Sequence, residues 1–356
     1  MANSNLSKAK IAKNDEFYTQ YQDIEKEILA YLDFNPDTFT GKTVLLPCDD
    51  PEWSNFTKFF AQNFDRLKLK KLISTSYSCE SKQNCKNYQP TLFETQDAQF
   101  DPLKTTKNGK IFTLEKDNNH DRRIDINDLE WTYLEGGGDF KSEEIKKLRD
   151  EADIIVTNPP FSLFRDFLTW IVEADKQFVI IGNMNAITYK EVFPLIKDNK
   201  MWLGKGFKGG AGHFINKYYE DYATATDRKE GMIRVSGVVW YTNLDHGRRH
   251  QPLPLMNCAD NLKFSKHKEL RGKEYQKYDN YDAIEVPFTD AIPSDYDGVM
   301  GVPISFLDKY SPEQFEIVGC SYDYGRPKNW SKDINMSPSV NGINIYKRIL
   351  IKHKQQ

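Results

Sequence analysis

Residues 158–161, Asn-Pro-Pro-Phe, are the part of this sequence whose residue types could do chemistry on an aromatic amine. The exocyclic amine of an aromatic ring is a poor nucleophile, because its lone pair is delocalised into the ring. Two acceptors, the side-chain carbonyl of Asn158 and the backbone carbonyl of Pro159, would localise the lone pair and aim it at an electrophilic methyl group. Pro160 would make the turn rigid, and Phe161 would stack on the ring.

The same four residues have a plainer interpretation as a turn in which the prolines only end a strand. Three features favour the catalytic interpretation. The apolar run 152–157 (ADIIVT) precedes Asn158, an aromatic residue closes the motif, and the next segment has the apolar stripe of a helix. No strong general base is needed, since the proton on the amine becomes acidic once the methyl group has been transferred.

The elements around this motif predict an α/β fold with a mostly parallel sheet and helices on both faces. Ligands bind at the carboxyl ends of the strands in such sheets, which is where the motif lies. The apolar runs expected to be strands are 43–47, 71–76, 152–157, 178–182 and 235–241, and the segments with helical periodicity are 21–32, 56–64, 142–150, 163–172 and 190–197. Ser142 is expected to cap the helix that follows it.

Two regions depart from this alternation. The polar stretch at about 77–135 has little apolar periodicity and is expected to be an insertion that forms a hairpin or loop. After about residue 245 the strand–helix rhythm is lost. We therefore expect a catalytic domain over residues 1–245 and a separate recognition region over 246–356. The tail YKRILIK is expected to be a final strand, at a sheet edge.

Composition excludes several classes of protein. The net charge of −3 gives no overall basic excess, so a nucleic-acid surface would need local clustering of charge. The five cysteines form no CxxC pair, which argues against both a zinc site and a disulfide framework and favours reduced thiols in a cytoplasm. The N-terminus has no apolar signal-peptide core and no apolar run is long enough to span a membrane. No metal site is expected.

TNPPFSLFRDF, with KNDEFYTQY and CDDPEWSNF upstream, resembles the EcoRI-type adenine-specific DNA methyltransferase family. The likeness extends to GGGDF, GVVWYTNL and PISFLDKYSPEQFEIVG, in that order along most of the chain. It implies a Rossmann-like fold that binds S-adenosyl-L-methionine. It assigns catalysis to Asn158, Pro159, Pro160 and Phe161, and the cofactor to Asp15, Glu16, Phe17, Tyr18, Thr19, Asp49, Asp50, Pro51, Asp139 and Phe140, the last two at a third-strand position.

The sequence departs from the common methyltransferase pattern after the first strand, where residues 48–51 (CDDP) replace a GxG turn. Without those glycines the backbone cannot approach a cofactor in the usual way, so side-chain carboxylates would contribute more. Asp49 and Asp50 could instead form an Asx-turn and cap the next helix. Asp15 and Glu16 could likewise cap a helix, and Asp139 could belong to a glycine-rich turn.

The expected DNA contacts lie in two basic clusters. Lys205 and Lys208, with two glycines after them, would grip phosphate, and Arg248, Arg249 and His250 would contact bases or backbone. Each cluster could also be an ordinary solvated face. An enzyme that acts on the adenine amine within a duplex must extrude the base, at a cost of a few kcal/mol.

The function expected from motif and resemblance is transfer of a methyl group from S-adenosyl-L-methionine to N6 of a flipped adenine in double-stranded DNA. Such an enzyme would be the modification half of a restriction–modification system. A cognate endonuclease would be a functional partner only, and the protein would be cytoplasmic in a bacterium or encoded by a phage. Two alternatives stay open: methylation of RNA guanine or protein glutamine, and a catalytically silent DNA-binding module.

Overall fold

The computed structural model describes residues 18–47, 49, 54–78, 95, 97–207, 210–215, 232–322, 325–330 and 337–354. The chain divides into two compact units. The first comprises Met1–Met184 and Gly204–Asp245, and the second comprises Asn185–Leu203 and His246–Gln356. Residues 185–203, which we had expected in the catalytic domain, thus belong to the second unit.

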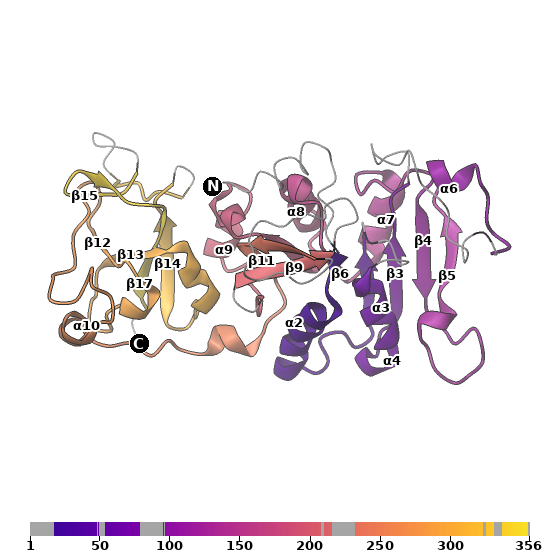
Figure 1. The fold of residues 1–356 in the computed structure, drawn as a ribbon, viewed down its shortest axis with the longest axis horizontal. Coiled ribbons are helices and arrows are strands. Elements are labelled where there is room, and N and C mark those ends of the chain that lie inside the picture. Colours follow the sequence, from indigo (N-terminus) through magenta and orange to yellow (C-terminus); the bar gives the residue numbers. More distant parts are fainter. Residues whose placement is uncertain are drawn as a thin grey trace. The chain divides into compact units, whose positions relative to one another are not determined.

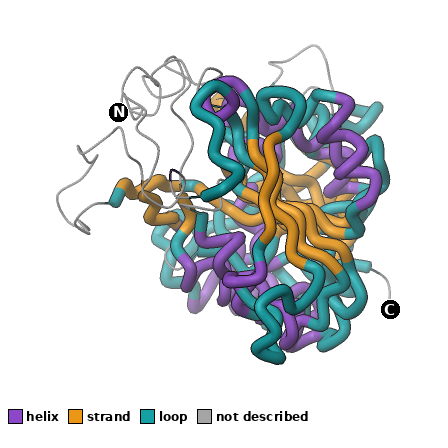
Figure 2. The backbone as a smooth tube through the Cα atoms, turned by 90° about the vertical axis from the view of Figure 1, so that its right-hand side faces the viewer, coloured by secondary structure: helices purple, strands orange, loops and turns teal. Residues whose placement is uncertain are grey.

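A twisted sheet forms the centre of the first unit (Figures 1 and 2). Seven of its strands stand in the order β5-β4-β3-β2-β6-β7-β11. Their bounds are Thr43–Leu46 (β2), Lys71–Thr75 (β3), Lys110–Leu114 (β4), Glu130–Tyr133 (β5), Ile154–Thr157 (β6), Gln177–Asn183 (β7) and Val238–Thr242 (β11). β3, β2, β6 and β7 are mutually parallel, whereas β4, β5 and β11 are added antiparallel. The sheet is therefore parallel only in its centre, not mostly parallel throughout.

Helices cover both faces of this sheet, as predicted. They are Tyr21–Phe34 (α2), Asn55–Gln62 (α3), Phe64–Leu67 (α4), Lys104–Lys107 (α6), Glu143–Glu151 (α7) and Phe164–Val172 (α8), with short 3-10 turns at Ile126–Asp128 (η3) and Phe161–Leu163 (η4). Two successive residues of β11 contact helices on opposite faces of the sheet. The Trp240 ring packs edge-on against Phe56 of α3 at 6.1 Å, and the Tyr241 ring packs against Phe164 of α8 at 5.2 Å. Since neighbouring side chains on a strand point to opposite faces, both faces are buried.

Two local predictions for the first unit are confirmed. The side chain of Ser142 accepts a hydrogen bond from the backbone N–H of Ile145, so it caps α7. The polar insertion carries a hairpin, in which β4 and β5 pair antiparallel and extend the sheet beyond β3. The loop between them is closed by the Asp128 carboxylate, which accepts backbone N–H groups from Asn118, Asn119 and Asp125.

The predicted single strand 235–241 is wrong. It is two strands, β10 (Ile233–Ser236) and β11, separated by Gly237 at φ +68°. A positive φ is a conformation that glycine adopts at little cost, and it redirects the chain here. β10 pairs with β9 (Ala211–Ile215) in a small second sheet, whose other edge is β1 (Tyr18–Thr19).

The second unit is built on a four-stranded sheet of order β12-β13-β17-β14. Its strands are Ala283–Glu285 (β12), Val299–Pro303 (β13), Phe315–Cys320 (β14) and Arg348–His353 (β17), and a separate hairpin pairs Ser339–Val340 (β15) with Ile343–Asn344 (β16). The remaining elements are η5 (Met184–Thr188), α9 (Phe193–Lys197), β8 (Trp202–Leu203), η8 (Gly247–His250), α10 (Cys258–Phe264), η9 (Thr289–Ala291) and η10 (Ile304–Lys309).

Two predictions for this unit need correction. The terminal strand β17 lies between β13 and β14, so it is an interior strand and not an edge. Its central residues Ile349, Leu350 and Ile351 are completely buried, and this burial accounts for the apolar character of the strand. The helix expected over 190–197 is shorter and begins at Phe193, with Pro194 in its first turn, where proline is tolerated.

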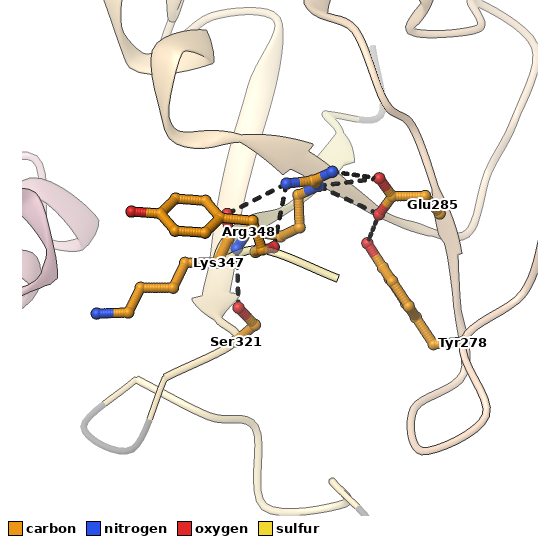
Figure 3. A network of polar contacts seen from close by, with 6 residues as sticks. Tyr278, Glu285, Ser321, Lys347 and Arg348 are labelled. Carbon is orange, nitrogen blue, oxygen red and sulfur yellow. Dashed lines mark hydrogen bonds and ion pairs between the residues drawn. The ribbon is translucent and has the colours of Figure 1, made fainter. Parts of the chain in front are cut away.

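A buried ion pair joins β17 to β12 (Figure 3). The Arg348 guanidinium donates to both carboxylate oxygens of Glu285, at 3.0 and 3.2 Å from Nε, and its backbone N–H donates to Ser321 at 2.8 Å. The hydroxyl of Tyr278 donates to the same carboxylate. A Cβ at Gly301 would lie 2.1 Å from that hydroxyl, so only glycine fits beside it. Removing two charges from water is costly, and the hydrogen bonds to the Glu285 carboxylate from Arg348 and Tyr278 offset that cost.

Candidate active site

The carboxyl ends of β2 and β6 meet at the centre of the sheet. The chain leaves β2 toward β3 on one side and leaves β6 toward β7 on the other, so a topological switch point lies between them. Ligands of open α/β sheets bind outside the strand ends at such a point. The hydroxyl of Thr157, the last residue of β6, donates to the carbonyl of Pro47 at 2.7 Å and ties the two strand ends together.

Asn158–Phe161 begin at this point, as predicted. Asn158 and Phe161 are half-buried, and the two prolines between them are buried. The Pro160 carbonyl accepts the backbone N–H of Leu163 at 2.9 Å, which starts the turn η4. Within the described part of the chain, no donor is bonded to the Pro159 carbonyl. A carbonyl in that position can accept a hydrogen bond from a bound molecule.

Thr19 lies beside the Asn158–Phe161 motif although 139 positions separate it from Asn158. The amide nitrogen Nδ2 of Asn158 donates to Thr19 Oγ1 at 3.4 Å. The carbonyl of Thr19 accepts from the side-chain amide of Asn55, the first residue of α3, at 2.8 Å. Pairing of β1 with β9 holds Tyr18 opposite Ile215 and Thr19 opposite Phe214. Two residues predicted to bind cofactor are thus held next to the predicted catalytic residue.

Asp49 follows β2 and is 7% exposed. Its carboxylate accepts the hydroxyl of Ser54, and Thr57 Oγ1 lies 3.1 Å from its other oxygen. Its own carbonyl accepts from Ser74 Oγ at 2.8 Å. The helix cap is Ser54, whose side chain accepts the backbone N–H of Phe56. Asp49 therefore supports the start of α3 through Ser54. This agrees in part with the alternative that Asp49 has a capping role for this helix. Its contact with a cofactor stays a prediction.

Asp139 and Phe140 lie in the loop between β5 and α7, and not in a strand, so the predicted third-strand position is wrong. The Phe140 ring is 1% exposed and packs against Phe167 and Trp170 of α8, at 5.2 and 5.7 Å. The Asp139 carboxylate accepts the backbone N–H of Lys141 at 2.9 Å, which is the turn that the alternative interpretation expected. Asp15, Glu16, Phe17, Asp50 and Pro51 lie outside the described residues.

The loop that begins at Lys205 is held by Glu27, a residue that the sequence reasoning missed. The Glu27 carboxylate is 1% exposed and accepts the backbone N–H groups of Lys205 and Gly206 at 2.9 and 3.1 Å and the hydroxyl of Tyr31 at 2.5 Å. Glu27 thus engages the backbone N–H groups at the start of the loop, and a phosphate contact by the Lys205 side chain stays a prediction. Burial, with Glu27 beside it, raises the pKa of Tyr31 well above its ordinary value.

A signal for Glu27 was present in the sequence. It stands on the apolar face of α2 between Ile24 and Ile28, which are both buried. A carboxylate on such a face must find donors in the folded chain, because burying an unpaired charge is too costly. The predicted partner of Lys205, Lys208, lies outside the described residues.

The three residues of the second basic cluster have partners within the second unit. Arg248 pairs with Asp308 at 2.5 Å, and His250 lies 2.8 Å from a carboxylate oxygen of Glu313. Arg249 is 7% exposed, and its guanidinium lies 3.8 Å from the centre of the Trp202 ring. A DNA contact by Arg249 is therefore not supported, because its planar group is stacked inside the unit. Contacts by Arg248 and His250 stay predictions.

The described residues contain no group of three His, Cys, Asp or Glu side chains that could hold a metal ion. No helix among them combines the length and the apolar character that a membrane span needs.

Comparison with known proteins adds an independent finding. A family described as "Adenine-specific methyltransferase EcoRI" matches residues 5–354. The chain is 43% identical to the Type II methyltransferase M.EcoRI of Escherichia coli, over 99% of this chain and 97% of the relative. It is 34% identical to the Type II methyltransferase M.MgeORF184P of Mycoplasma genitalium, over 98% of this chain and 99% of the relative. It is 33% identical to M.MpnI of Mycoplasma pneumoniae, over 88% and 85%. No solved structure matches.

Proposed function

The chain belongs to the EcoRI family of adenine-specific methyltransferases, and from that premise we propose that the switch point between β2 and β6 is where the methyl group is transferred. The protein is a Type II DNA adenine methyltransferase, and DNA is its substrate. What we propose beyond this concerns the cofactor, the residues that act, the surface that meets DNA and the Rossmann-like character of the sheet.

We propose S-adenosyl-L-methionine as the methyl donor, bound outside the carboxyl ends of β2 and β3. The donor set fits such a group. Asp49 places a carboxylate there, which suits the cofactor's ammonium or hydroxyl groups. Thr75, the last residue of β3, has a buried hydroxyl that makes no hydrogen bond in the described part of the chain. A buried polar atom without a partner is rare and is expected to gain one when a ligand or water binds.

The central strand order, with parallel strands on each side of a switch point, supports a Rossmann-like assignment for this sheet. Tyr18 is proposed to lie over the cofactor, because its strand β1 is held beside Asn158. Asp139 is proposed to contribute from its loop. The buried ring of Phe140 supports that loop through its packing on α8 and is less suited to direct contact.

When bound, the cofactor supplies an electrophilic methyl group on a sulfonium. The residues of this chain then position the nucleophile. The Asn158 side-chain carbonyl and the Pro159 backbone carbonyl accept the two N–H groups of the adenine amine, which draws its lone pair out of the ring and fixes its direction. The half-buried Phe161 stacks on the base. The observation that carries this proposal is the Pro159 carbonyl beside Asn158, which no described residue satisfies.

Duplex DNA must release the adenine before it reaches this site. We propose that the second unit provides much of the contact with the duplex. It contains 19 Lys and Arg residues against 16 Asp and Glu, whereas the rest of the chain contains 30 against 36, so the second unit has a net positive charge and the rest a net negative one. Arg248 and His250 in that unit and Lys205 in the first are the proposed contacts, and a cognate endonuclease is the proposed functional partner.

A labelled-cofactor assay tests this proposal. The protein is incubated with methyl-labelled S-adenosyl-L-methionine and, separately, with duplex DNA, RNA and unfolded protein, and the DNA nucleosides are then separated by mass. We expect label only in DNA, as N6-methyl-2′-deoxyadenosine. Label in RNA guanine or in glutamine, or cofactor binding with no label in any acceptor, would overturn it.

A further inference from the structure

We propose that Thr19 is a positioning residue for methyl transfer, and that it holds the side chain of Asn158 so that its carbonyl end faces the adenine amine. This inference rests on the proposed role of Asn158 as an acceptor. It differs from the expected role of Thr19, which was contact with the cofactor.

An asparagine amide has a donor end and an acceptor end, and only the acceptor end can draw on an adenine N–H. Asn158 Nδ2 is directed at Thr19 Oγ1, 3.4 Å away, and this contact leaves Oδ1 at the other end of the amide. Asn158 is only half-buried, so packing alone restrains its side chain less than that of Thr19, which is 2% exposed. The hydroxyl therefore supplies a fixed point for the donor end of the Asn158 amide.

Thr19 can act as a fixed point because it is anchored from two directions. Its backbone pairs with Phe214 of β9, and the neighbouring Gln20 donates from Nε2 to the carbonyl of His213 at 2.8 Å. Its carbonyl accepts from Asn55 Nδ2 at 2.8 Å. Reorientation of Thr19 would break its hydrogen bonds to β9 and to α3 together. Restraint of this kind from several neighbouring elements is what precise positioning of a functional side chain requires.

The anchor also connects the two strand ends of the site. Asp49, after β2, accepts from Ser54, which caps α3, and the next residue, Asn55, holds Thr19. Thr19 in turn meets Asn158, after β6. Hydrogen bonds, together with the peptide bond between Ser54 and Asn55, thus connect the proposed cofactor end to the proposed acceptor through the start of α3.

The test compares Thr19→Val with Thr19→Ser in single-turnover methyl transfer to duplex DNA. Valine keeps the shape of threonine and removes the hydroxyl, whereas serine keeps it. We expect Thr19→Val to lower the transfer rate about 10-fold or more, while the dissociation constant for S-adenosyl-L-methionine changes less than about 2-fold, and Thr19→Ser to restore most of the rate. Base extrusion, followed by 2-aminopurine fluorescence at the target position, should be unchanged.

Thr43→Val is the matched control, because Thr43 is a buried threonine at the opposite end of β2 and its hydroxyl makes no hydrogen bond in the described part of the chain. It should transfer at the wild-type rate, and circular dichroism should show all variants folded. A wild-type rate in Thr19→Val, or a defect confined to cofactor affinity, would overturn the inference. Absence of DNA methylation by the unaltered protein would instead refute the proposed function.

Discussion

Replacement of Glu27 by alanine tests how the first unit holds the loop that carries Lys205. The substitution removes the acceptor of three hydrogen bonds, those from Tyr31 and from the backbone N–H groups of Lys205 and Gly206. A buried donor left without a partner costs about 1–3 kcal/mol. The Tyr31 hydroxyl lies on a fully buried side chain and loses its carboxylate acceptor there, whereas Lys205 is exposed and Gly206 partly so, which lets water reach their N–H groups.

The free energy of unfolding should therefore fall by roughly 3 kcal/mol in Glu27→Ala, mainly from Tyr31 with smaller contributions from the loop. In Glu27→Gln one oxygen can still accept, and the loss should be about 1 kcal/mol. The double variant Glu27→Ala/Tyr31→Phe removes donor and acceptor together, so it should be less destabilised than the sum of the single variants.

Urea unfolding followed by circular dichroism measures these changes, and hydrogen exchange at Lys205 and Gly206 shows whether the loop opens. Glu25→Ala, at a partly exposed position of the same helix, is the matched control and should change stability by less than about 0.5 kcal/mol. A loss in Glu27→Ala no larger than in this control, or strictly additive losses in the double variant, would refute the assignment of Glu27 as the anchor of the loop.

Three further predictions concern other parts of the first unit. Gly182→Ala should destabilise the protein by about 1–3 kcal/mol in urea unfolding, because the added Cβ would lie 2.4 Å from the ring of Phe164. Unchanged stability would contradict the tight packing of Phe164, and with it α8, against β7. Asp49→Asn should lower the free energy of unfolding by about 1–2 kcal/mol and weaken cofactor binding in calorimetry. An amide supplies one oxygen acceptor, whereas the carboxylate supplies one each to Ser54 and Thr57. A variant as stable as the wild type would contradict these hydrogen bonds. Backbone N–H groups, that of Asp125 foremost, hold the pKa of Asp128 below its usual 3.8. The Asp128 carboxylate therefore stabilises the loop fully above pH 3.8, and this stabilisation is lost as the pH falls through the lower pKa of the folded state. Hydrogen-exchange rates in this loop that do not rise on acidification, or that rise equally in Asp128→Asn, would contradict this.

The position of the proposed catalytic motif was predictable from the sequence, because it depends on local signals. An apolar strand, an Asn-Pro-Pro-Phe turn and a helix with an apolar stripe follow one another within about twenty residues, and the structure has β6, η4 and α8 there. The capping of α7 by Ser142 was predictable for the same reason. Local composition is enough where each element is long and periodic.

The contacts around the motif were not predictable, because they join residues far apart in the chain. The bond from Asn158 to Thr19 depends on β1 pairing with β9, and both strands are too short for a periodic pattern. Gly237 divides one apolar run into strands of two different sheets, which depends on a single positive φ. Periodicity identified β17 as a strand but could not give its neighbours, so its interior position was missed.

Single-turnover transfer by Asn158→Ala tests the central claim most directly. Duplex DNA and saturating methyl-labelled S-adenosyl-L-methionine are mixed with the wild type or the variant, and N6-methyl-2′-deoxyadenosine is quantified over time. We predict a rate at least about 100-fold below that of the wild type, with cofactor affinity retained, because one of the two acceptors for the amine is lost. Transfer by the variant at the wild-type rate would contradict the assignment of Asn158 and, with it, the proposed active site.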